Sequence, residues 1–318
     1  MPTGRVIGID AGGTKLLAGV VDERLLVHHR VHRVIRGLGQ RKLLEVMVEV
    51  VEEARAAEPD VGAVGFGIPS RVDADLGVSE GSVHLPLDGV PFRALMSERL
   101  GLPVAVDNDA NAALLAESRA GAARGARCAA MVTLGTGIGG GLLIDGELFR
   151  GNYGGGAELG HMIVDIDGPE CSCGSRGCLE ALASGSAIGR LGEEAARKAP
   201  DSALGRALGA REELSGRLVT ELAHDGDEMA RDVLASVGRS LGAGIANIVN
   251  IFEPQVVVVG GGAIAGGELL LEPARKVVAS RALYPARDRV RIAAAEFGDE
   301  AGMVGAALLA MDVVRTPY

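Results

Sequence analysis

The chain has 318 residues, of which 47% are apolar, enough for two ordinary domains with separate cores. Its formal net charge of −10 argues against nucleic acid or an acidic membrane surface as the main partner, because phosphate backbones are bound through dense Lys and Arg. We find no secretory signal and no stretch near the roughly 20 apolar residues that a membrane helix needs. Three of the four cysteines crowd into eight positions, a poor layout for a secreted disulfide framework. We therefore expect a cytoplasmic protein with neither a nucleic-acid nor a membrane partner.

The first half of the chain alternates short apolar strands with amphipathic helices. Strands are expected over residues 6–10, 16–21, 26–34, 61–68 and 103–106. Helices are expected over 40–57, 92–100 and 110–121. A glycine turn joins the first two strands as a tight hairpin.

The second half begins in the same way as the first. Strands are expected over 129–134, 142–144 and 255–259, with residues 135–141 as a glycine turn and 151–177 irregular. Helices are expected over 181–199, 227–252, from about 269, and over 302–314. Because strand, polar glycine-rich hairpin and strand occur twice, the pattern indicates two related α/β halves. No low-complexity linker separates them, and we place the boundary near residue 115.

Three glycine-rich turns lie next to strands, at Gly12-Gly13, Gly135 to Gly141, and Gly260 to Gly262. Such turns let backbone N–H groups point at an anion without interference from a Cβ atom. In the first turn, the Asp10 carboxylate can hold hydrated Mg²⁺, while Thr14 and Lys15 can meet phosphate oxygens. A single such turn would merely make a tight hairpin, but three of them favour a nucleotide.

Two common nucleotide-binding motifs are excluded. No Gly-x-x-x-x-Gly-Lys-Ser/Thr sequence follows a strand, so the first turn is not a Walker loop. Gly135, Gly137 and Gly140 fit the dinucleotide spacing by letter count. They lead into a strand and not a helix, which rules out a Rossmann site.

One histidine and three cysteines have the spacing of a metal site. His161, Cys171, Cys173 and Cys178 make a closed tetrahedral zinc set, because one imidazole and three thiolates fill all four positions. The ion is therefore expected to be structural and not a Lewis acid. The plainer interpretation is a set of reduced surface thiols plus an unrelated histidine. Cys128 stands alone and is expected to be a small buried residue.

Asp109 follows a strand and precedes a helix, a rigid position near the positive end of the helix dipole. That position lowers the pKa of a carboxylate and keeps it ionised, as a base for phosphoryl transfer requires. Taken alone, an aspartate there is better explained as a plain N-cap. Together with the glycine-rich turns that favour a nucleotide, the role of a base is the favoured interpretation of Asp109.

These motifs occur in an order that resembles the ROK family (repressors, open reading frames and sugar kinases), and within it the bacterial glucokinases. The resemblance covers nearly the full chain and rests on four motifs: the run from Asp10 to Lys15, Asp107 to Asn111, Leu134 to Gly141, and Glu158 to His161 followed by Cys171 to Glu180. It implies an α/β fold of the two-domain actin/hexokinase-like (ribonuclease H-like) type with an interdomain cleft. We assign 1–115 plus 300–318 to a small N-terminal domain and 116–299 to a larger domain that carries the zinc loop.

The same resemblance implies roles for individual residues. Asp109 matches the catalytic base, and the sugar ligands match Asn108, Asp109, Glu158, His161 and Glu180. Phosphate contacts match Gly12, Gly13, Thr14, Thr136 and Gly137, and the adenosine side matches Gly261 and its neighbour Gly262. The implied reaction transfers the γ-phosphate of ATP to D-glucose with Mg²⁺ and a structural Zn²⁺ present. Family members are commonly dimers or tetramers, so a homo-oligomer is expected.

Alternatives remain at the level of the sequence. Ser70 stands where the family often has glycine, and the segment 82–87 lacks the usual Asn-Leu and Trp. Both lie near the expected sugar site, so an N-acetylglucosamine, N-acetylmannosamine or fructose kinase is the nearest rival. A sugar-responsive repressor would need a DNA-binding segment before Asp10, where only nine residues are present. A sugar-binding protein without catalysis is disfavoured because Asp10, Lys15 and Asp109 are all in place.

Overall fold

The structure is a computed structural model that describes residues 4–82, 84–211 and 213–315. The chain forms two compact units and passes between them four times. The first unit comprises the residues up to Gly125, Glu147–Ala157 and the residues from Glu296 onward. The second comprises Ala126–Gly146 and Glu158–Ala295. Within the described residues, no helix combines the length and apolarity needed to cross a bilayer.

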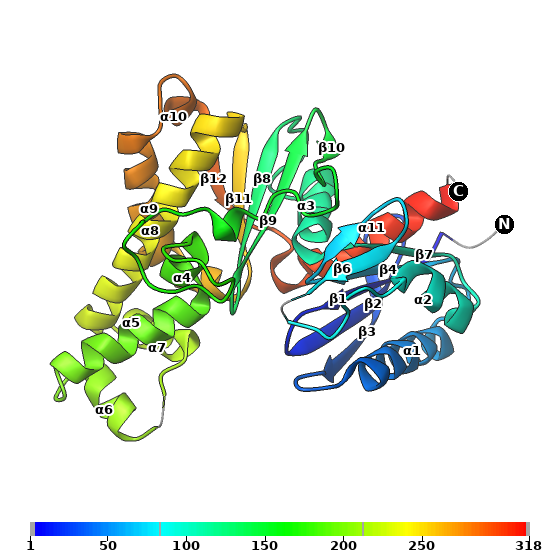
Figure 1. The fold of residues 1–318 in the computed structure, drawn as a ribbon, viewed down its shortest axis with the longest axis horizontal. Coiled ribbons are helices and arrows are strands. Elements are labelled where there is room, and N and C mark those ends of the chain that lie inside the picture. Colours follow the sequence, from blue (N-terminus) through cyan, green and yellow to red (C-terminus); the bar gives the residue numbers. More distant parts are fainter. Residues whose placement is uncertain (1–3, 83, 212, 316–318) are drawn as a thin grey trace. The chain divides into compact units, whose positions relative to one another are not determined.

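The first unit is built on a five-stranded sheet in the order β3-β2-β1-β4-β7 (Figure 1). Its strands are β1 (Val6–Ala11), β2 (Lys15–Val21), β3 (Val27–Val34), β4 (Val64–Ile68) and β7 (Val104–Asn108). The first three form an antiparallel meander, whereas β1, β4 and β7 run parallel. A separate hairpin pairs β5 (Arg71–Asp73) with β6 (Val78–Gly81). The helices are α1 (Gln40–Ala57), α2 (Phe92–Leu100), α3 (Asp109–Ala120) and α11 (Ala301–Arg315), with the short 3₁₀ helix η3 (Gly298–Glu300) before α11.

The C-terminal helix α11 lies directly on the backbone of the first sheet, against β1, β4 and α3 (Figure 1). A methyl group at Gly65 in β4 would lie 1.7 Å from the carbonyl oxygen of Ala306. One at Gly8 in β1 would lie 2.0 Å from the carbonyl oxygen of Met303. A methyl group at Gly305 of the helix would lie 1.7 Å from the carbonyl oxygen of Ala112 in α3. Glycine is therefore required on both sides of this interface, because any Cβ atom would overlap a backbone atom.

The second unit contains strands in the order β9-β8-β11-β12. They are β8 (Ala129–Leu134), β9 (Ile138–Ile144), β11 (Val256–Gly260) and β12 (Arg291–Ala294). The two-residue strand β10 (Glu147–Leu148) begins the segment Glu147–Ala157 of the first unit. Strands β8, β11 and β12 run parallel, while β8 and β9 form an antiparallel hairpin. The α-helices are α4 (Leu179–Ala183), α5 (Gly185–Lys198), α6 (Ala203–Gly209), α7 (Gly216–His224), α8 (Glu228–Phe252), α9 (Glu268–Arg281) and α10 (Ala286–Arg289). Two 3₁₀ helices complete it, η1 (Leu159–His161) and η2 (Gly262–Gly266), and the long α8 packs along α9 (Figure 1).

Most expected elements are confirmed, and two expectations are wrong. Residues 135–141 are not all turn, because Ile138–Ile144 form β9 and pair with β8 through Gly139, Gly140 and Gly141. The expected helix over 181–199 is two helices, α4 and α5. The break falls at Ser184, whose side chain accepts a hydrogen bond from the Ala187 amide and so caps the second helix. The sequence analysis also missed the β5–β6 hairpin, α6, α7 and β12.

The contact between α11 and the sheet gives a stability prediction. Gly65→Ala is expected to lower the free energy of unfolding by about 2–4 kcal/mol, because the added methyl group overlaps the Ala306 carbonyl group. Gly39→Ser is the matched control in the same unit, since nothing lies within 4 Å of a Cβ atom at Gly39 and serine is a preferred N-cap for α1. Guanidinium unfolding of both variants measures the difference. Equal midpoints would show that the packing is looser than described.

Candidate active site and metal centre

The turn between β1 and β2 opens onto a cavity of about 310 Å³ in the first unit. The cavity is lined by Asp10, Gly12, Lys15, Leu17, His32 and Asp299. The amide of Gly12 donates to the Lys15 carbonyl oxygen at 2.9 Å, which closes the turn. Asp299 was not expected from the sequence, and its carboxylate lies 3.8 Å from the Lys15 ammonium. Its position in the polar run before the final helix was the available signal.

Asp10 is a half-buried acid that lies among other charges. Burial, and then the negative charges of Asp109 and Asp299, raise the pKa of Asp10 to about 7, against the opposing effect of the Lys15 ammonium. The α11 helix begins against this carboxyl group, since a Cβ atom at Gly302 would lie 2.6 Å from the Asp10 Cγ atom. A cation that enters the cavity would therefore stabilise the ionised form of this carboxyl group.

The junction of β7 and α3 carries the expected base. Asn108, not Asp109, is the N-cap of α3, and its side-chain oxygen accepts from the amides of Ala110 at 2.9 Å and Asn111 at 3.2 Å. Asp109 is the first residue of the helix, where the positive end of the helix dipole favours an ionised carboxylate. The N-cap position considered for Asp109 thus belongs to its neighbour, while the Asp109 carboxylate accepts a hydrogen bond from the Ala110 amide at 2.9 Å.

Sheet register explains why the expected phosphate turn and the expected base lie close together. Asp10 of β1 is level with Gly67 of β4, and Gly67 is level with Asp107 of β7. The carboxyl ends of these three parallel strands therefore meet at one edge of the sheet, the usual place for a site in such folds. A Cβ atom at Gly67 would lie 3.4 Å from the Asp109 Cα atom, so the absence of a side chain there keeps this edge open.

In the second unit, Thr136 and Gly137 form the turn of the β8–β9 hairpin. The amide of Gly135 donates to the Gly137 carbonyl oxygen at 2.9 Å, and the Ser186 hydroxyl donates to the Thr136 carbonyl oxygen at 2.8 Å. Gly261, just after β11, has a positive φ of 81°, and a Cβ atom there would lie 2.5 Å from the Leu134 carbonyl oxygen. The expected phosphate turn and the expected adenosine turn, Gly261 with Gly262, are thus adjacent at one end of the second sheet.

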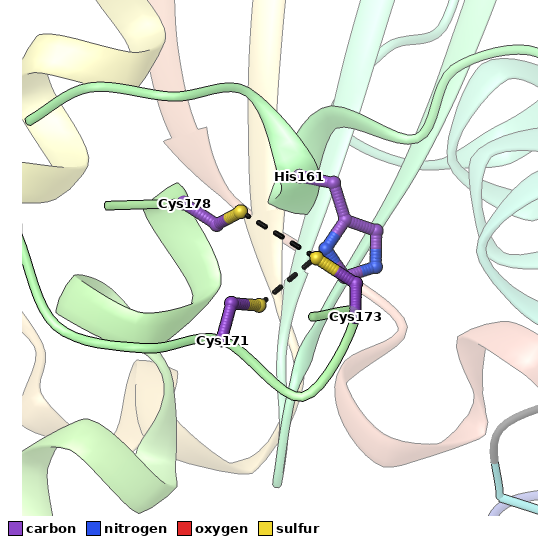
Figure 2. A group of neighbouring side chains, drawn as sticks. All are labelled: His161, Cys171, Cys173 and Cys178. Carbon is purple, nitrogen blue, oxygen red and sulfur yellow. Dashed lines mark hydrogen bonds between the residues drawn. The ribbon is translucent and has the colours of Figure 1, made fainter. Parts of the chain in front are cut away.

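Figure 2 shows the side chains of His161, Cys171, Cys173 and Cys178 pointing toward one another. Their potential ligand atoms all lie within 4.8 Å of one another. The Cys171 sulfur is 3.7 Å from His161 Nδ1, and the Cys173 and Cys178 sulfurs are 3.7 Å apart. A tetrahedral zinc ion with ordinary bond lengths requires ligand atoms about 3.6–3.8 Å apart, so two edges already have the right length. The four residues therefore fit zinc.

The pKa of the Cys178 thiol also bears on metal binding. Burial, followed by the neighbouring Cys171 and Cys173 thiols, raises the pKa of Cys178 to about 12. A thiolate at this position therefore needs a positive charge beside it, which a bound metal ion supplies. Cys128 is separate and half-buried, and its thiol donates to the Phe252 carbonyl oxygen at 3.4 Å.

Glu180 links the cysteine-rich loop to the glycine hairpin. One of its oxygens accepts from the Ile138 amide at 2.9 Å, beside Gly137, and the other accepts from the Ser172 hydroxyl at 2.8 Å. A Cβ atom at Gly137 would lie 2.3 Å from the first of these oxygens. Glu158 immediately precedes η1, which ends at His161. The second unit therefore brings the metal cluster, Glu180 and the hairpin turn together.

Comparisons with known proteins agree with this architecture. The ROK family model matches residues 6–313, and this chain belongs to that family. It is 36% identical to a glucokinase of Streptomyces coelicolor over 97% of this chain and 98% of that protein. It is 29% identical to a xylose repressor of Caldicellulosiruptor bescii over 99% of this chain and 80% of the repressor.

Among solved structures, the chain resembles a ROK family glucokinase from Streptomyces griseus in complex with glucose and AMPPNP, with a TM-score of 0.89 and 37% identity. The match covers 97% of this chain and 100% of that one. The fold is therefore the α/β fold of the actin and hexokinase type that the motifs implied.

The raised pKa of Asp10 predicts a stabilising substitution. An acid whose pKa is raised from 3.8 to about 7 on folding costs stability increasingly as the pH rises between these values, and no more above them. Asp10→Asn is therefore expected to melt at a higher temperature than the parent, with an advantage that grows from pH 5 to about pH 7 and then levels off. Melting curves in buffers without divalent cations measure it.

Asp312→Asn, an exposed position on α11 in the same unit, is the control and is expected to show no such pH profile. An Asp10→Asn advantage that is the same at pH 5 and pH 8 would contradict the raised pKa.

Proposed function

We propose that this chain is an ATP-dependent glucokinase, which transfers the γ-phosphate of ATP to the 6-hydroxyl of D-glucose. The observation that carries the proposal is the placement of Asp109, at a rigid strand-to-helix junction beside the Asp10 turn, in a chain of the same family and length as glucokinases. Phosphoryl transfer needs a positioned hydroxyl, a carboxylate to accept its proton and charge stabilisation around the phosphate. The glucose bound to the Streptomyces griseus relative supports the choice of sugar.

In this proposal Asp109 accepts the proton of the attacking hydroxyl, from its position at the positive end of the α3 dipole. Asn108, Glu158, His161 and Glu180 hold the remaining sugar hydroxyls. His161 turns Nδ1 toward the Cys171 thiol, which leaves Nε2 as the nitrogen that can meet a hydroxyl. Glu180 already accepts hydrogen bonds from the Ile138 amide, the Ser172 hydroxyl and the Cys171 thiol, and the remaining lone pairs of its oxygens would serve the sugar.

The nucleotide would be held by the glycine turns. Gly12, Gly13, Thr14, Thr136 and Gly137 would contact phosphate oxygens through backbone and hydroxyl groups, while Gly261 and Gly262 would border the adenosine. Lys15 lies at the cavity and would meet a phosphate oxygen in exchange for Asp299. Asp10 would hold hydrated Mg²⁺, which neutralises charge on the transferred phosphoryl group when bound.

Zinc would be structural in this proposal. His161, Cys171, Cys173 and Cys178 would fill its coordination shell, so that no position stays open for catalysis. Its contribution would be to hold the loop 158–180 in shape, and with it the sugar ligands Glu158, His161 and Glu180. A cytoplasmic location and a homodimeric or homotetrameric state are further parts of the proposal.

A coupled assay of ATP consumption tests the substrate. Glucose, mannose, fructose, N-acetylglucosamine and N-acetylmannosamine are compared at equal concentration, and the highest kcat/KM is expected for glucose. Preference for another of these sugars would replace glucokinase by the corresponding kinase of the family. If none of these sugars is phosphorylated, the proposed kinase activity is refuted.

Asp109→Asn tests the base. Because the amide cannot accept the proton of the hydroxyl, the substitution is expected to lower kcat by about 10²–10⁴-fold. Because it is nearly isosteric and keeps the helix start, little change in melting temperature is expected. Asp73→Asn, at the end of β5 in the same unit, is the matched control and is expected to keep turnover within about twofold of the parent. Full turnover by Asp109→Asn on the best sugar would overturn the assignment of the base.

Cys178→Ala tests the zinc site. The parent is expected to contain one zinc ion per chain by elemental analysis, and the variant is expected to lose the ion, melt at a lower temperature and bind glucose more weakly, because the loop loses its cross-link. Cys128→Ala is the matched control and is expected to keep the ion. Zinc-free parent protein with the same melting temperature before and after chelation would show that the cluster is a set of plain thiols.

A further inference from the structure

The carboxylate of Asp107 is buried and fully occupied by polar partners. Its side chain is 3% exposed, and one oxygen receives two nitrogens of the Arg150 guanidinium, Nε at 2.8 Å and a terminal nitrogen at 2.7 Å. The other oxygen accepts from the Asn108 amide at 2.7 Å and from the Asn111 side chain at 3.0 Å. Arg150 is the cation that balances this buried charge, so the geometry of the junction before Asp109 depends on it.

Arg150 also begins a short segment, the strap, that packs against β5. The strap, residues 150–156, is closed by the Gly156 amide donating to the Arg150 carbonyl oxygen at 2.9 Å. Its Gly154, with a positive φ of 72°, lies against β5, where a Cβ atom would be 1.9 Å from the Val72 carbonyl oxygen. Strap and hairpin therefore pack backbone to backbone.

The hairpin in turn reaches Asn108 through Ser70, the residue just before β5. The carbonyl oxygen of Ser70 faces the Asn108 side-chain amide at 3.4 Å. The hydroxyl of Ser70 is buried, donates to the Gly81 carbonyl oxygen at 2.9 Å and also contacts the Ser79 hydroxyl, so it ties β5 to β6. Ser70 replaces a glycine of the family pattern, and its hydroxyl adds a cross-link to the hairpin that holds Asn108.

We infer that Arg150 is a positioning residue for the sugar-binding and base segment Asn108–Asp109, acting through its two-point ion pair with Asp107. Asn108 is held from its backbone amide by Asp107 and from its side chain by Ser70 and the α3 cap. Arg150 fixes the contact between Asp107 and the Asn108 amide by holding the Asp107 carboxylate. It supports the contact between Ser70 and the Asn108 side chain through the strap and β5. This inference rests on the proposed sugar-kinase function, since it assigns Arg150 to the geometry of that site.

Loss of the guanidinium leaves a buried carboxylate without its cation, and the carboxylate then turns toward water or toward another donor. The Asn108 amide and the start of α3 follow it. Displacements of about 1 Å at a reacting group cost around 10²-fold in rate. The β1–β2 turn, which holds the expected phosphate ligands, makes no hydrogen bond or ion pair with Asp107 or Arg150 among the described residues, so the KM for ATP should change far less.

The experiment compares Arg150→Gln, Arg150→Lys and the double variant Asp107→Asn/Arg150→Gln. We expect Arg150→Gln to lower kcat/KM for glucose by about 10²-fold and to weaken glucose binding in nucleotide-free calorimetry, with the KM for ATP within about twofold of the parent. Arg150→Lys should recover part of the loss, because an ammonium restores the charge but not the two-point contact. The double variant should be no worse than Arg150→Gln, since both act through one pair.

Arg5→Gln is the control, because it breaks another partly buried ion pair of the first unit, with Glu58, away from the site. It should leave glucose affinity unchanged. The inference fails if Arg150→Gln is folded and binds glucose as the parent does, or if Arg5→Gln reproduces its loss of glucose affinity. Failure of the proposed function is separate: it shows as retained turnover in Asp109→Asn, whereas the glucose affinity of the Arg150 variants decides the positioning role.

Discussion

The backbone contact between α11 and the first sheet is the constraint on which the first unit's site depends. Gly8, Gly65 and Gly305 let the helix lie directly on β1, β4 and α3. The helix thereby begins with Gly302 against the Asp10 carboxyl group, and its middle fixes α3, which begins at Asp109. The β1–β2 turn and the start of α3 therefore belong to one packed body, with Asp10 and Asp109 near enough for the charge of Asp109 to raise the pKa of Asp10.

The two acids at this end of the sheet, the buried Asp107 and the half-buried Asp10, have different electrostatic environments. Asp107 is fully satisfied by Arg150 and two N–H donors, and it serves to hold its neighbours. Asp10 is left with a pKa raised to about 7, a cost in stability that a cation in the cavity would remove. In the second unit, burial and the neighbouring thiols raise the pKa of Cys178 to about 12, so a bound metal ion would stabilise its thiolate. Glu180 connects the cysteine-rich loop to the glycine hairpin.

Local signals in the sequence were sufficient for much of the fold. The helices at 40–57 and 92–100 and the strand at 129–134 follow from apolar spacing, and the metal cluster follows from four residues close in sequence. Elements that depend on distant partners escaped. The β5–β6 hairpin is short and partly polar. Strand β9 is rich in glycine, so its pairing with β8, and not its own strand propensity, makes it a strand. Arg150 and Asp299 were missed because each acts on residues far away in the sequence.

The most direct measurement of the central claim is the fate of the phosphate. Phosphorus NMR of a mixture of ATP, Mg²⁺ and glucose with the parent chain should show one phosphomonoester at the sugar 6-position for each ADP formed, and Asp109→Asn should form neither at a comparable rate. Inorganic phosphate rising in step with ADP, with no sugar phosphomonoester, would contradict the transfer. A phosphomonoester formed equally fast by Asp109→Asn would contradict the role of the base.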